Sequence, residues 1–266
     1  MTALRPVTVI TGASAGIGTA LARVFARHGH ALALVARRAE RLHALADEIA
    51  AAGQPRPIVI VADLQQPGAA SVIAEALTVH GAEPQYMVNN AGFGLVGSAL
   101  ARDRAEQLAM IDLNVRTLAE LSLAFVDSLE RHQGGLLNVG SVAGFLPGPG
   151  MTVYYASKAF VLSFSEALHS ELLGRVRVTV LCPGPVPTEF GQRAGVKGRG
   201  LAPPFFSESP EKVAEAGYRG LMAGKRVVVP GVIAKLAVLV IRVVPRRLLL
   251  AAVDARQRRR RAARSA

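Results

Sequence analysis

The sequence predicts a doubly wound α/β fold, with a mainly parallel seven-stranded sheet and helices on both of its faces. Short β-like apolar runs alternate with helix-like stretches along residues 1–230, as in successive βαβ units. About half of the 266 residues are apolar, and a chain of this length can bury a large core. Because no repeat or linker divides residues 1–230, we expect them to form one domain that residues 231–266 extend.

Seven short apolar runs predict the strands of this sheet. Each run has four to six residues and lies between turn-like or helix-like segments, so its length favours a strand over a helix. The predicted strands cover residues 7–10, 31–36, 57–62, 85–89, 136–140, 176–181 and 226–229.

The helices are predicted where apolar residues recur with the 3.6-residue period of one helix face. Residues 191–207 are rich in Gly and Pro and predict a loop. Ser209 and Pro210 then predict the N-cap and the first helical position of a further helix. The periodic stretches cover residues 17–28, 39–52, 70–80, 104–132 and 152–173.

A glycine-rich turn, TGASAGIG at residues 11–18, joins the first strand to the first helix. Its glycines at 12, 16 and 18 allow a tight turn and let a pyrophosphate approach the helix N-terminus, where free N–H groups and the helix dipole favour an anion. The spacing differs from the common G-x-G-x-x-G fingerprint, and a tight turn without a ligand is the alternative. The turn indicates a Rossmann-type dinucleotide site.

Two arginines, Arg37 and Arg38, follow the second predicted strand, and no acidic residue appears before Glu40. Enzymes of this architecture that bind NAD usually carry an acidic residue here, which holds the ribose 2′-hydroxyl. Guanidinium groups suit a 2′-phosphate instead, both by charge and by their forked geometry. The pair therefore favours NADP over NAD, and the solvated start of a helix is the alternative reading.

Six motifs occur along the chain in one order: TGASAGIG at 11–18, NNAG at 89–92, MIDLNV at 110–115, NVGSVAG at 138–144, YYASK at 154–158 and PGPVPTEF at 183–190. By these motifs the chain resembles the short-chain dehydrogenase/reductase family from residue 7 to about residue 230. The resemblance implies the strand order 3-2-1-4-5-6-7 and hydride transfer between a nicotinamide cofactor and a carbonyl/alcohol pair.

The motif YYASK offers two candidate tyrosines for this chemistry. Residues three or four apart on a helix are neighbours, so helical geometry allows Lys158 to lie beside Tyr154 or Tyr155. The pattern tyrosine–x–alanine–serine–lysine of the family matches Tyr154, which follows Ser141 by thirteen residues. The resemblance therefore selects Tyr154, and we expect Tyr155 to be a packing residue.

These residue types suit acid–base chemistry on a carbonyl. A free phenol has a pKa of about 10, so Tyr154 needs a lowered pKa to exchange protons near neutrality, and the charge of Lys158 stabilises the phenolate. Ser141 can donate a hydrogen bond to the substrate oxygen as charge develops there. The resemblance further implies that Lys158 holds the nicotinamide ribose and that Asn114 anchors a water of a proton relay.

The resemblance also implies a set of cofactor-binding residues, which includes Tyr154 and Lys158. Ala15 departs from the family, because many relatives that prefer NADP carry a basic residue at this position; the 2′-phosphate is left to the two arginines after the second strand. The other expected residues are Gly12, Ser14, Gly16, Ile17 and Gly18 in the turn, Arg37 and Arg38, Asp63 and Leu64 beside the adenine, Asn90, Ala91 and Gly92 beside the adenosine ribose, and Pro183, Gly184, Val186 and Thr188 at the nicotinamide.

The substrate is predicted to be a small carbonyl or alcohol of apolar character. Residues 93–96, 145–151 and 205–206, together with Phe190, are mostly apolar and are expected to form the wall of the substrate pocket. Two other functions remain open. One is a regulator that binds the cofactor without turnover, and the other is a scaffold that its C-terminal extension recruits to a membrane.

The charge of the chain is concentrated at its C-terminus. The net charge is +12, but residues 246–266 hold eight arginines and one aspartate, and the rest shows no basic stripe interleaved with aromatic residues. We therefore expect no nucleic-acid partner. The six histidines show no metal-ligand spacing, so no metal is expected. The single cysteine and the lack of a predicted signal peptide favour a cytoplasmic protein.

The extension of residues 231–266 begins apolar and ends in arginines. Residues 232–244 predict a helix that Pro245 ends, with Lys235 and Arg242 on one face. No stretch reaches the roughly 20 apolar residues that span a membrane. Two readings stay open: an interfacial helix with a basic tail on anionic lipid, or a helix that packs on its own domain or on a sister subunit of a homo-oligomer.

Overall fold

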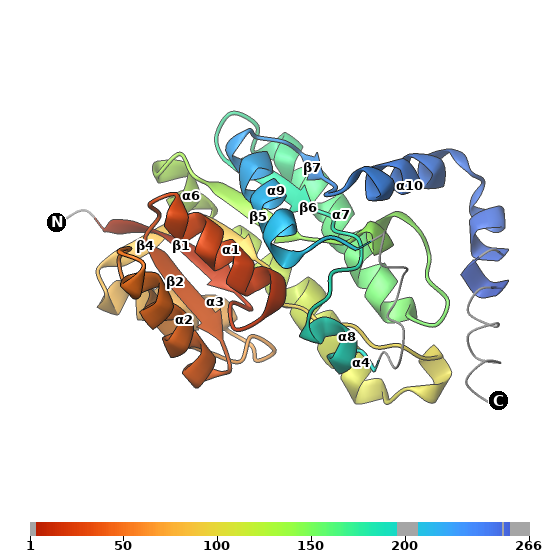
Figure 1. The fold of residues 1–266 in the computed structure, drawn as a ribbon, viewed down its shortest axis with the longest axis horizontal. Helices are drawn as coiled ribbons and strands as arrows, with labels where there is room; N and C mark the ends of the chain where they lie inside the picture. The colour runs from red at the N-terminus through yellow and green to blue at the C-terminus, as the bar shows by residue number, and fades with distance from the viewer. Residues whose placement is uncertain (1–3, 196–206, 252, 256–266) are drawn as a thin grey trace.

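A seven-stranded parallel sheet forms the centre of the protein in a computed structural model that describes residues 4–195, 207–251 and 253–255. The strands lie in the order β3-β2-β1-β4-β5-β6-β7, and each neighbouring pair is parallel, which confirms the predicted sheet (Figure 1). The strands are β1 (Arg5–Thr11), β2 (Leu32–Ala36), β3 (Ile58–Val61), β4 (Ala82–Asn89), β5 (Gly135–Val139), β6 (Arg177–Leu181) and β7 (Val227–Val228).

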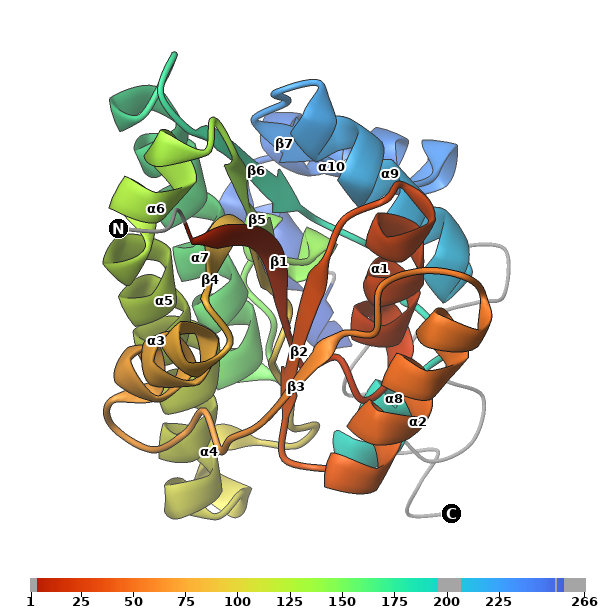
Figure 2. The same ribbon diagram turned by 90° about the vertical axis from the view of Figure 1, so that its left-hand side faces the viewer.

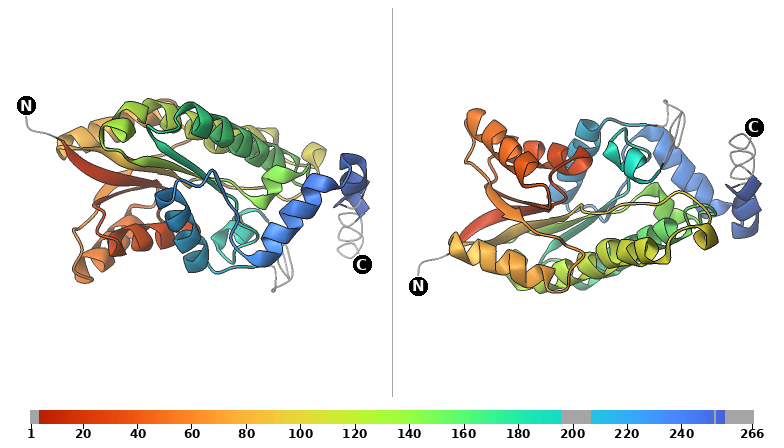
Figure 3. Two further views of the ribbon diagram at one scale, coloured as in Figure 1. Left: turned by 90° about the horizontal axis from the view of Figure 1, so that it is seen from above. Right: turned by 90° about the horizontal axis from the view of Figure 1, so that it is seen from below.

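Helices cover both faces of the sheet, as Figures 2 and 3 show. The connection from β3 to β4 crosses the sheet, so strands are added on one side of β1 before it and on the other side after it. One face carries α1 (Gly16–Arg27), α2 (Ala39–Ala51) and α9 (Pro210–Met222); the other carries α3 (Ala69–Val79), α5 (Leu118–Ala124), α6 (Val126–Arg131) and α7 (Thr152–Glu171).

Strand β2 shows why a strand in this sheet can consist of apolar residues alone. All five of its residues are buried, and successive side chains point to opposite faces. Leu34 therefore packs in the core beneath α1, α2 and α9, while Ala33 and Val35 pack in the core on the other face. A strand covered on both faces needs no polar positions, which explains its pattern.

The stretch 104–132 was predicted as one helix, and this prediction is wrong in detail. The structure divides it into α4 (Arg104–Ile111), a π-helical turn η2 (Asp112–Thr117), α5 and α6. The wider turn contains Asn114, which is fully buried and bonded to the backbone of Phe93. This long-range contact favours a local departure from the helix, which apolar periodicity does not reveal.

The region after β6 is partly helical. The predicted loop 191–207 overlaps the short helix α8 (Glu189–Arg193), and residues 196–206 lie outside the described residues. The start of α9 is confirmed: the Ser209 hydroxyl accepts a hydrogen bond from the N–H of Lys212 at 3.3 Å, and Pro210 opens the helix.

The described part of the C-terminal extension projects from the body of the protein at the end opposite the start of β1 (Figure 1). Helix α10 (Val232–Val243) ends before Pro245 as predicted, and residues 246–251 and 253–255 are helical again. Helix α10 packs against the 3₁₀ turn η3 (Val142–Phe145), where the Arg242 guanidinium lies 5.4 Å from the centre of the Phe145 ring. Among the described residues, no helix has the length and apolar character to cross a membrane.

Candidate active site

A cavity of about 1170 Å³ opens at the carboxyl ends of the strands. Its lining residues follow β1, β2, β3, β4, β5 and β6, and a ligand crevice is expected here in a doubly wound sheet. All predicted cofactor residues except Gly18 line it: Gly12, Ser14, Ala15, Gly16, Ile17, Arg37, Arg38, Asp63, Leu64, Asn90, Ala91, Gly92, Tyr154, Lys158, Pro183, Gly184, Val186 and Thr188.

The glycine-rich turn is held in a conformation that requires glycine. Gly12 and Gly16 have φ angles of +66° and +58°, which other residues rarely adopt. A Cβ atom on Gly18 would lie 2.2 Å from the carbonyl oxygen of Gly12, so Gly18 lies behind the turn and lets the helix pack against it. The N-cap of α1 is Ala15, whose side chain accepts no hydrogen bond, so within the described part of the chain no side chain caps the first N–H groups of the helix.

Asn90 ties the turn to the end of β4. Its side-chain amide donates to the carbonyl oxygens of Thr11 at 2.9 Å and of Gly12 at 3.2 Å. The Thr11 hydroxyl accepts in return from the backbone N–H groups of Asn90 and Ala91. The two predicted cofactor loops are therefore hydrogen-bonded to each other.

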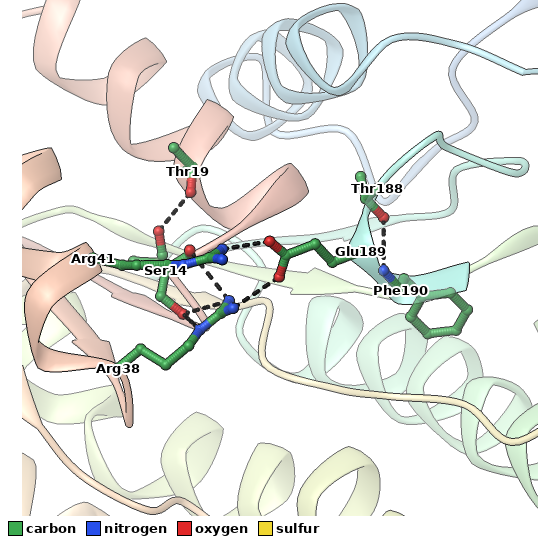
Figure 4. A network of polar contacts seen from close by, with 8 residues as sticks. Ser14, Thr19, Arg38, Arg41, Thr188, Glu189 and Phe190 are labelled. Atoms are coloured by element: carbon green, nitrogen blue, oxygen red, sulfur yellow. Dashed lines mark hydrogen bonds and ion pairs between the residues drawn. The ribbon is translucent and has the colours of Figure 1, made fainter. Parts of the chain in front are cut away.

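A network of charged groups occupies the end of the cavity beside Arg38, where the adenosine was expected (Figure 4). Arg38 donates to the hydroxyl of Ser14 at 3.1 and 3.2 Å and to a carboxylate oxygen of Glu189 at 2.8 Å. Arg41 donates to the other carboxylate oxygen of Glu189. Hydrogen bonds from Arg41 and Arg38 lower the pKa of Glu189 to about 2. Ser14 and Arg38 were predicted from the sequence, whereas Arg41 and Glu189 were given no role, although Glu189 lies inside the motif PGPVPTEF.

Two further arginines approach this end of the cavity. Arg37 lies 3.9 Å from a carboxylate oxygen of Asp63, a looser pairing than that of Arg38. Arg193 lines the cavity with its guanidinium 4.4 Å from the centre of the Phe93 ring. Partial burial lowers the pKa of Arg193, and the charges of Arg37 and Arg38 lower it further. Positive charge therefore gathers where a 2′-phosphate was expected to bind.

The predicted catalytic side chains meet on the opposite wall. Ser141 follows β5, and its hydroxyl accepts a hydrogen bond from the N–H of Ala143 at 3.1 Å. Tyr154 and Lys158 lie one turn apart on α7, with the Lys158 Nζ atom 5.9 Å from the centre of the Tyr154 ring. The same Nζ atom donates to the carbonyl oxygen of Val139 at 2.8 Å. One strand end and one helix thus bring the three residues together.

Burial determines the protonation of this group. It raises the pKa of Tyr154 to about 12, although a hydrogen bond with Ser141 opposes the shift. Burial also lowers the pKa of Lys158 to about 8. The pKa of Tyr154 is therefore raised in the protein by itself, where a lowered pKa was expected, because desolvation of the phenol outweighs the interactions that favour its charged form.

Asn114 lies beneath the cavity and does not line it. Its side chain accepts from the N–H of Phe93 at 3.1 Å and donates to the carbonyl of Phe93 at 2.9 Å and to the Ser157 hydroxyl at 3.1 Å. A Cβ atom on Gly92 would lie 2.9 Å from Asn114 Oδ1 and 3.7 Å from Lys158 Nζ. The missing side chain of Gly92 therefore lets Asn114 and Lys158 approach the same loop.

The substrate wall agrees only in part with the expectation. Leu146, Met151 and Phe190 line the cavity, residues 93–96 do not, and residues 205–206 lie outside the described residues. The Phe190 ring lies 5.4 Å from that of Tyr154. Tyr155, which was expected to be a packing residue, also lines the cavity. Lining residues outside the motifs include Gln192, Arg193, Ser207 and Val253.

The parallel sheet and the cavity at its switch point define a doubly wound α/β protein of the nucleotide-binding type. The family model of the short chain dehydrogenases matches residues 6–197. The chain therefore belongs to the short chain dehydrogenase family, a family of oxidoreductases.

Individual relatives differ in their activities and bound cofactors. The chain is 42% identical over 185 residues to a sulfoacetaldehyde reductase of Chromohalobacter salexigens. The aligned residues cover 68% of this chain and 72% of that protein. A short-chain dehydrogenase from Sphingobium yanoikuyae, solved with NADPH, has a TM-score of 0.77 at 32% identity and covers 88% of this chain and 92% of that one. A relative from Burkholderia phymatum, solved with NAD, has a TM-score of 0.76 at 25% identity, with coverages of 90% and 93%.

Proposed function

We propose that this protein is an NADP(H)-dependent oxidoreductase that acts on a carbonyl/alcohol pair, with Tyr154 as the general acid and base. One observation carries the proposal: Ser141, Tyr154 and Lys158 meet in the cavity that also holds the glycine-rich turn and the arginine cluster. The cavity of about 1170 Å³ has room for a dinucleotide and a small substrate together.

The residues of the cavity fit such a cofactor. The start of α1 presents N–H groups that no side chain caps, which suits a pyrophosphate. Gly12 leaves no room for a side chain, because a Cβ atom there would lie 2.9 Å from the Cα atom of Ala91. Arg38, with Ser14, would hold a 2′-phosphate. Bound NADPH would supply the hydride for carbonyl reduction.

In the reduction, the carbonyl carbon accepts the hydride and the carbonyl oxygen takes the proton of Tyr154, which yields the alcohol and a phenolate. A pKa of about 12 keeps this proton on Tyr154 at neutral pH, as a donor requires. Lys158, with a pKa of about 8, is mainly protonated at neutral pH, so its charge stabilises the phenolate. Ser141 donates to the substrate oxygen, and Asn114 positions the loop at Phe93 beside Lys158.

Arginine 38 should determine the preference for NADP(H). Replacing Arg38 with alanine is expected to weaken NADPH binding by about 1–3 kcal/mol, because charge-assisted hydrogen bonds to the phosphate are lost. Binding of NADH should change little. Titration calorimetry with both cofactors checks this, with Arg56→Ala as the control, since Arg56 forms an exposed ion pair with Asp47 and does not line the cavity. Equal losses for NADPH and NADH in Arg38→Ala would contradict the assignment.

The substrate is proposed to be a small carbonyl compound with an apolar group. Leu146, Met151 and Phe190 supply the apolar wall, and the sulfoacetaldehyde reductase at 42% identity makes aldehydes a class to include. A panel of aldehydes and ketones, sulfoacetaldehyde among them, tests the proposal through the loss of nicotinamide absorbance. NADPH binding without turnover across the panel would favour a regulator that binds the cofactor.

The extension is proposed to contact anionic lipid. Val232, Leu236, Leu239 and Val243 on α10 are 70%, 57%, 60% and 78% exposed, although Ala234 and Val238 on the same helix are buried. One face of the helix therefore leaves its apolar side chains uncovered. Exposed apolar residues on a helix that carries Lys235 and Arg242, followed in the sequence by an arginine-rich tail, match an interfacial helix at an anionic surface. A sister subunit is the alternative partner for this surface.

Replacing both Leu236 and Leu239 with glutamate should abolish co-sedimentation with anionic vesicles, because two apolar contacts become repulsive charges. The control replaces Val72 and Val79 on α3, which are 46% and 84% exposed, with glutamate and should still bind. Light scattering on the same proteins detects a sister subunit as a change of oligomeric state. If the wild-type protein does not co-sediment with anionic vesicles at low salt, the lipid proposal is contradicted.

A further inference from the structure

Glu189, the first residue of α8, connects two walls of the cavity at its adenosine end. Its carboxylate accepts hydrogen bonds from Arg38 and Arg41, which lie 151 and 148 positions earlier in the chain. Figure 4 shows the carboxylate facing both guanidinium groups, with Ser14 on the other side of Arg38. The carboxylate therefore lies against the guanidinium group that the proposed function assigns to a 2′-phosphate.

We propose that Glu189 is a specificity-determining residue whose carboxylate holds Arg38 and Arg41 until the 2′-phosphate of NADP(H) replaces it. The exchange releases α8 from the start of α2, so binding of the phosphate loosens the segment beside the cavity. This inference rests on the proposed function, because it requires that NADP(H) binds in the cavity.

The chemistry of the two anions favours exchange. A phosphate presents more oxygen atoms and more charge to a guanidinium than a carboxylate does. The side chains of Arg38, Arg41 and Glu189 are 42%, 50% and 45% exposed, so solvent weakens the bridges that must break. The low pKa of Glu189, about 2, keeps the carboxylate charged at neutral pH, so it repels an approaching phosphate unless it moves away.

Thr188 links the exchange to the glycine-rich turn. It is the N-cap of α8, and a Cβ atom on Gly16 would lie 2.9 Å from its Cγ2 atom. The start of α8 therefore packs closely against the glycine-rich turn, which is proposed to bind the pyrophosphate. NAD(H) carries a neutral 2′-hydroxyl, so it gives no charge to displace Glu189. The residue should therefore oppose NADP(H) binding and leave NAD(H) binding nearly unaffected.

Titration calorimetry on the full chain tests the effect on affinity. Glu189→Gln and Glu189→Ala should each bind NADPH about three to ten times more tightly, as the loss of exposed ion pairs allows. NADH affinity should change less than about twofold. Glu40→Gln is the matched control, because it removes an exposed carboxylate from the same end of α2. Unchanged or weaker NADPH binding in both Glu189 variants would overturn the proposal and show that Glu189 positions the arginines instead.

Hydrogen–deuterium exchange tests the release of α8 without any turnover. Adenosine 2′,5′-bisphosphate and adenosine 5′-monophosphate differ only in the 2′-phosphate. The bisphosphate should speed amide exchange in residues 189–195 of the wild type relative to the monophosphate, and Glu189→Gln should exchange rapidly with both. If amide exchange in the wild type is equally fast or slower with the bisphosphate, the proposal that the 2′-phosphate displaces Glu189 is overturned.

The two proposals fail in different ways. A wild-type protein that binds neither NADPH nor NADH overturns the proposed function and this inference with it. Wild-type binding of NADPH with no gain in Glu189→Gln and Glu189→Ala overturns the inference alone. Far-ultraviolet circular dichroism of each variant shows that the fold is retained before affinities are compared.

Discussion

Replacing Tyr154 with phenylalanine is expected to lower the rate of carbonyl reduction by about 10²–10⁴-fold, the usual contribution of a positioned acid. The substitution removes only the phenolic hydroxyl, so the ring still packs against Phe190 and the cavity keeps its shape. NADPH affinity should stay within a few-fold of the wild type. Single-turnover absorbance measurements at saturating NADPH separate the loss of chemistry from any loss of binding.

Tyr155→Phe is the matched control for this change. Tyr155 also lines the cavity, but a Cβ atom on Gly148 would lie 2.2 Å from its ring, so its ring packs closely over that glycine. Its replacement should alter the rate by less than about tenfold, because the contact of the ring is kept. An inactive Tyr155→Phe beside an active Tyr154→Phe would reverse the assignment.

Replacing Lys158 with methionine is expected to abolish reduction and to stabilise the fold at neutral pH. Lys158 is 5% exposed, and burial lowers its pKa from 10.5 to about 8. The difference, 10.5 − 8 = 2.5 pKa units, corresponds to roughly 3 kcal/mol of unfavourable free energy for the buried ammonium. Losing the hydrogen bond to Val139 offsets about 1 kcal/mol of the gain, so the free energy of unfolding should rise by about 2 kcal/mol.

The gain should depend on pH in a defined direction. Below pH 8 the folded and unfolded states both hold the Lys158 proton, so the cost of burying the charge is fully present. Between pH 8 and 10.5 the folded state releases this proton while the unfolded state keeps it, and the cost declines. Urea unfolding of the wild type and of Lys158→Met should therefore differ most at pH 7 and less at pH 10. A variant less stable than the wild type at pH 7 would contradict the cost of the buried charge.

The sequence was sufficient for the sheet, because its central strands, such as β2 and β5, are buried on both faces and show as short apolar runs. It was insufficient for the π-helical turn at Asn114. The side chain of Asn114 bonds the backbone of Phe93, 21 residues earlier, and apolar periodicity carries no information on such a contact. The same limit applies to α8, which begins inside a motif and continues into a stretch rich in Gly and Pro.

The residues of the candidate site were predictable where a motif holds them, and unpredictable where separate motifs meet. The turn, Ser141, Tyr154 and Lys158 all lie at the predicted cavity. The bridge from Glu189 to Arg38 and Arg41 joins residues about 150 positions apart, so only the fold reveals it. The pKa of Tyr154 was expected to fall, because charge was considered without the larger effect of burial.

The most direct test of the account is single-turnover carbonyl reduction by the wild type and Tyr154→Phe, measured with NADPH bound at saturation. The account predicts that the wild type oxidises NADPH with at least one aldehyde or ketone of the panel, and that Tyr154→Phe binds NADPH equally well but reacts about 10²–10⁴ times more slowly. Equal rates in the two proteins, or NADPH binding without oxidation by any carbonyl compound, would contradict it.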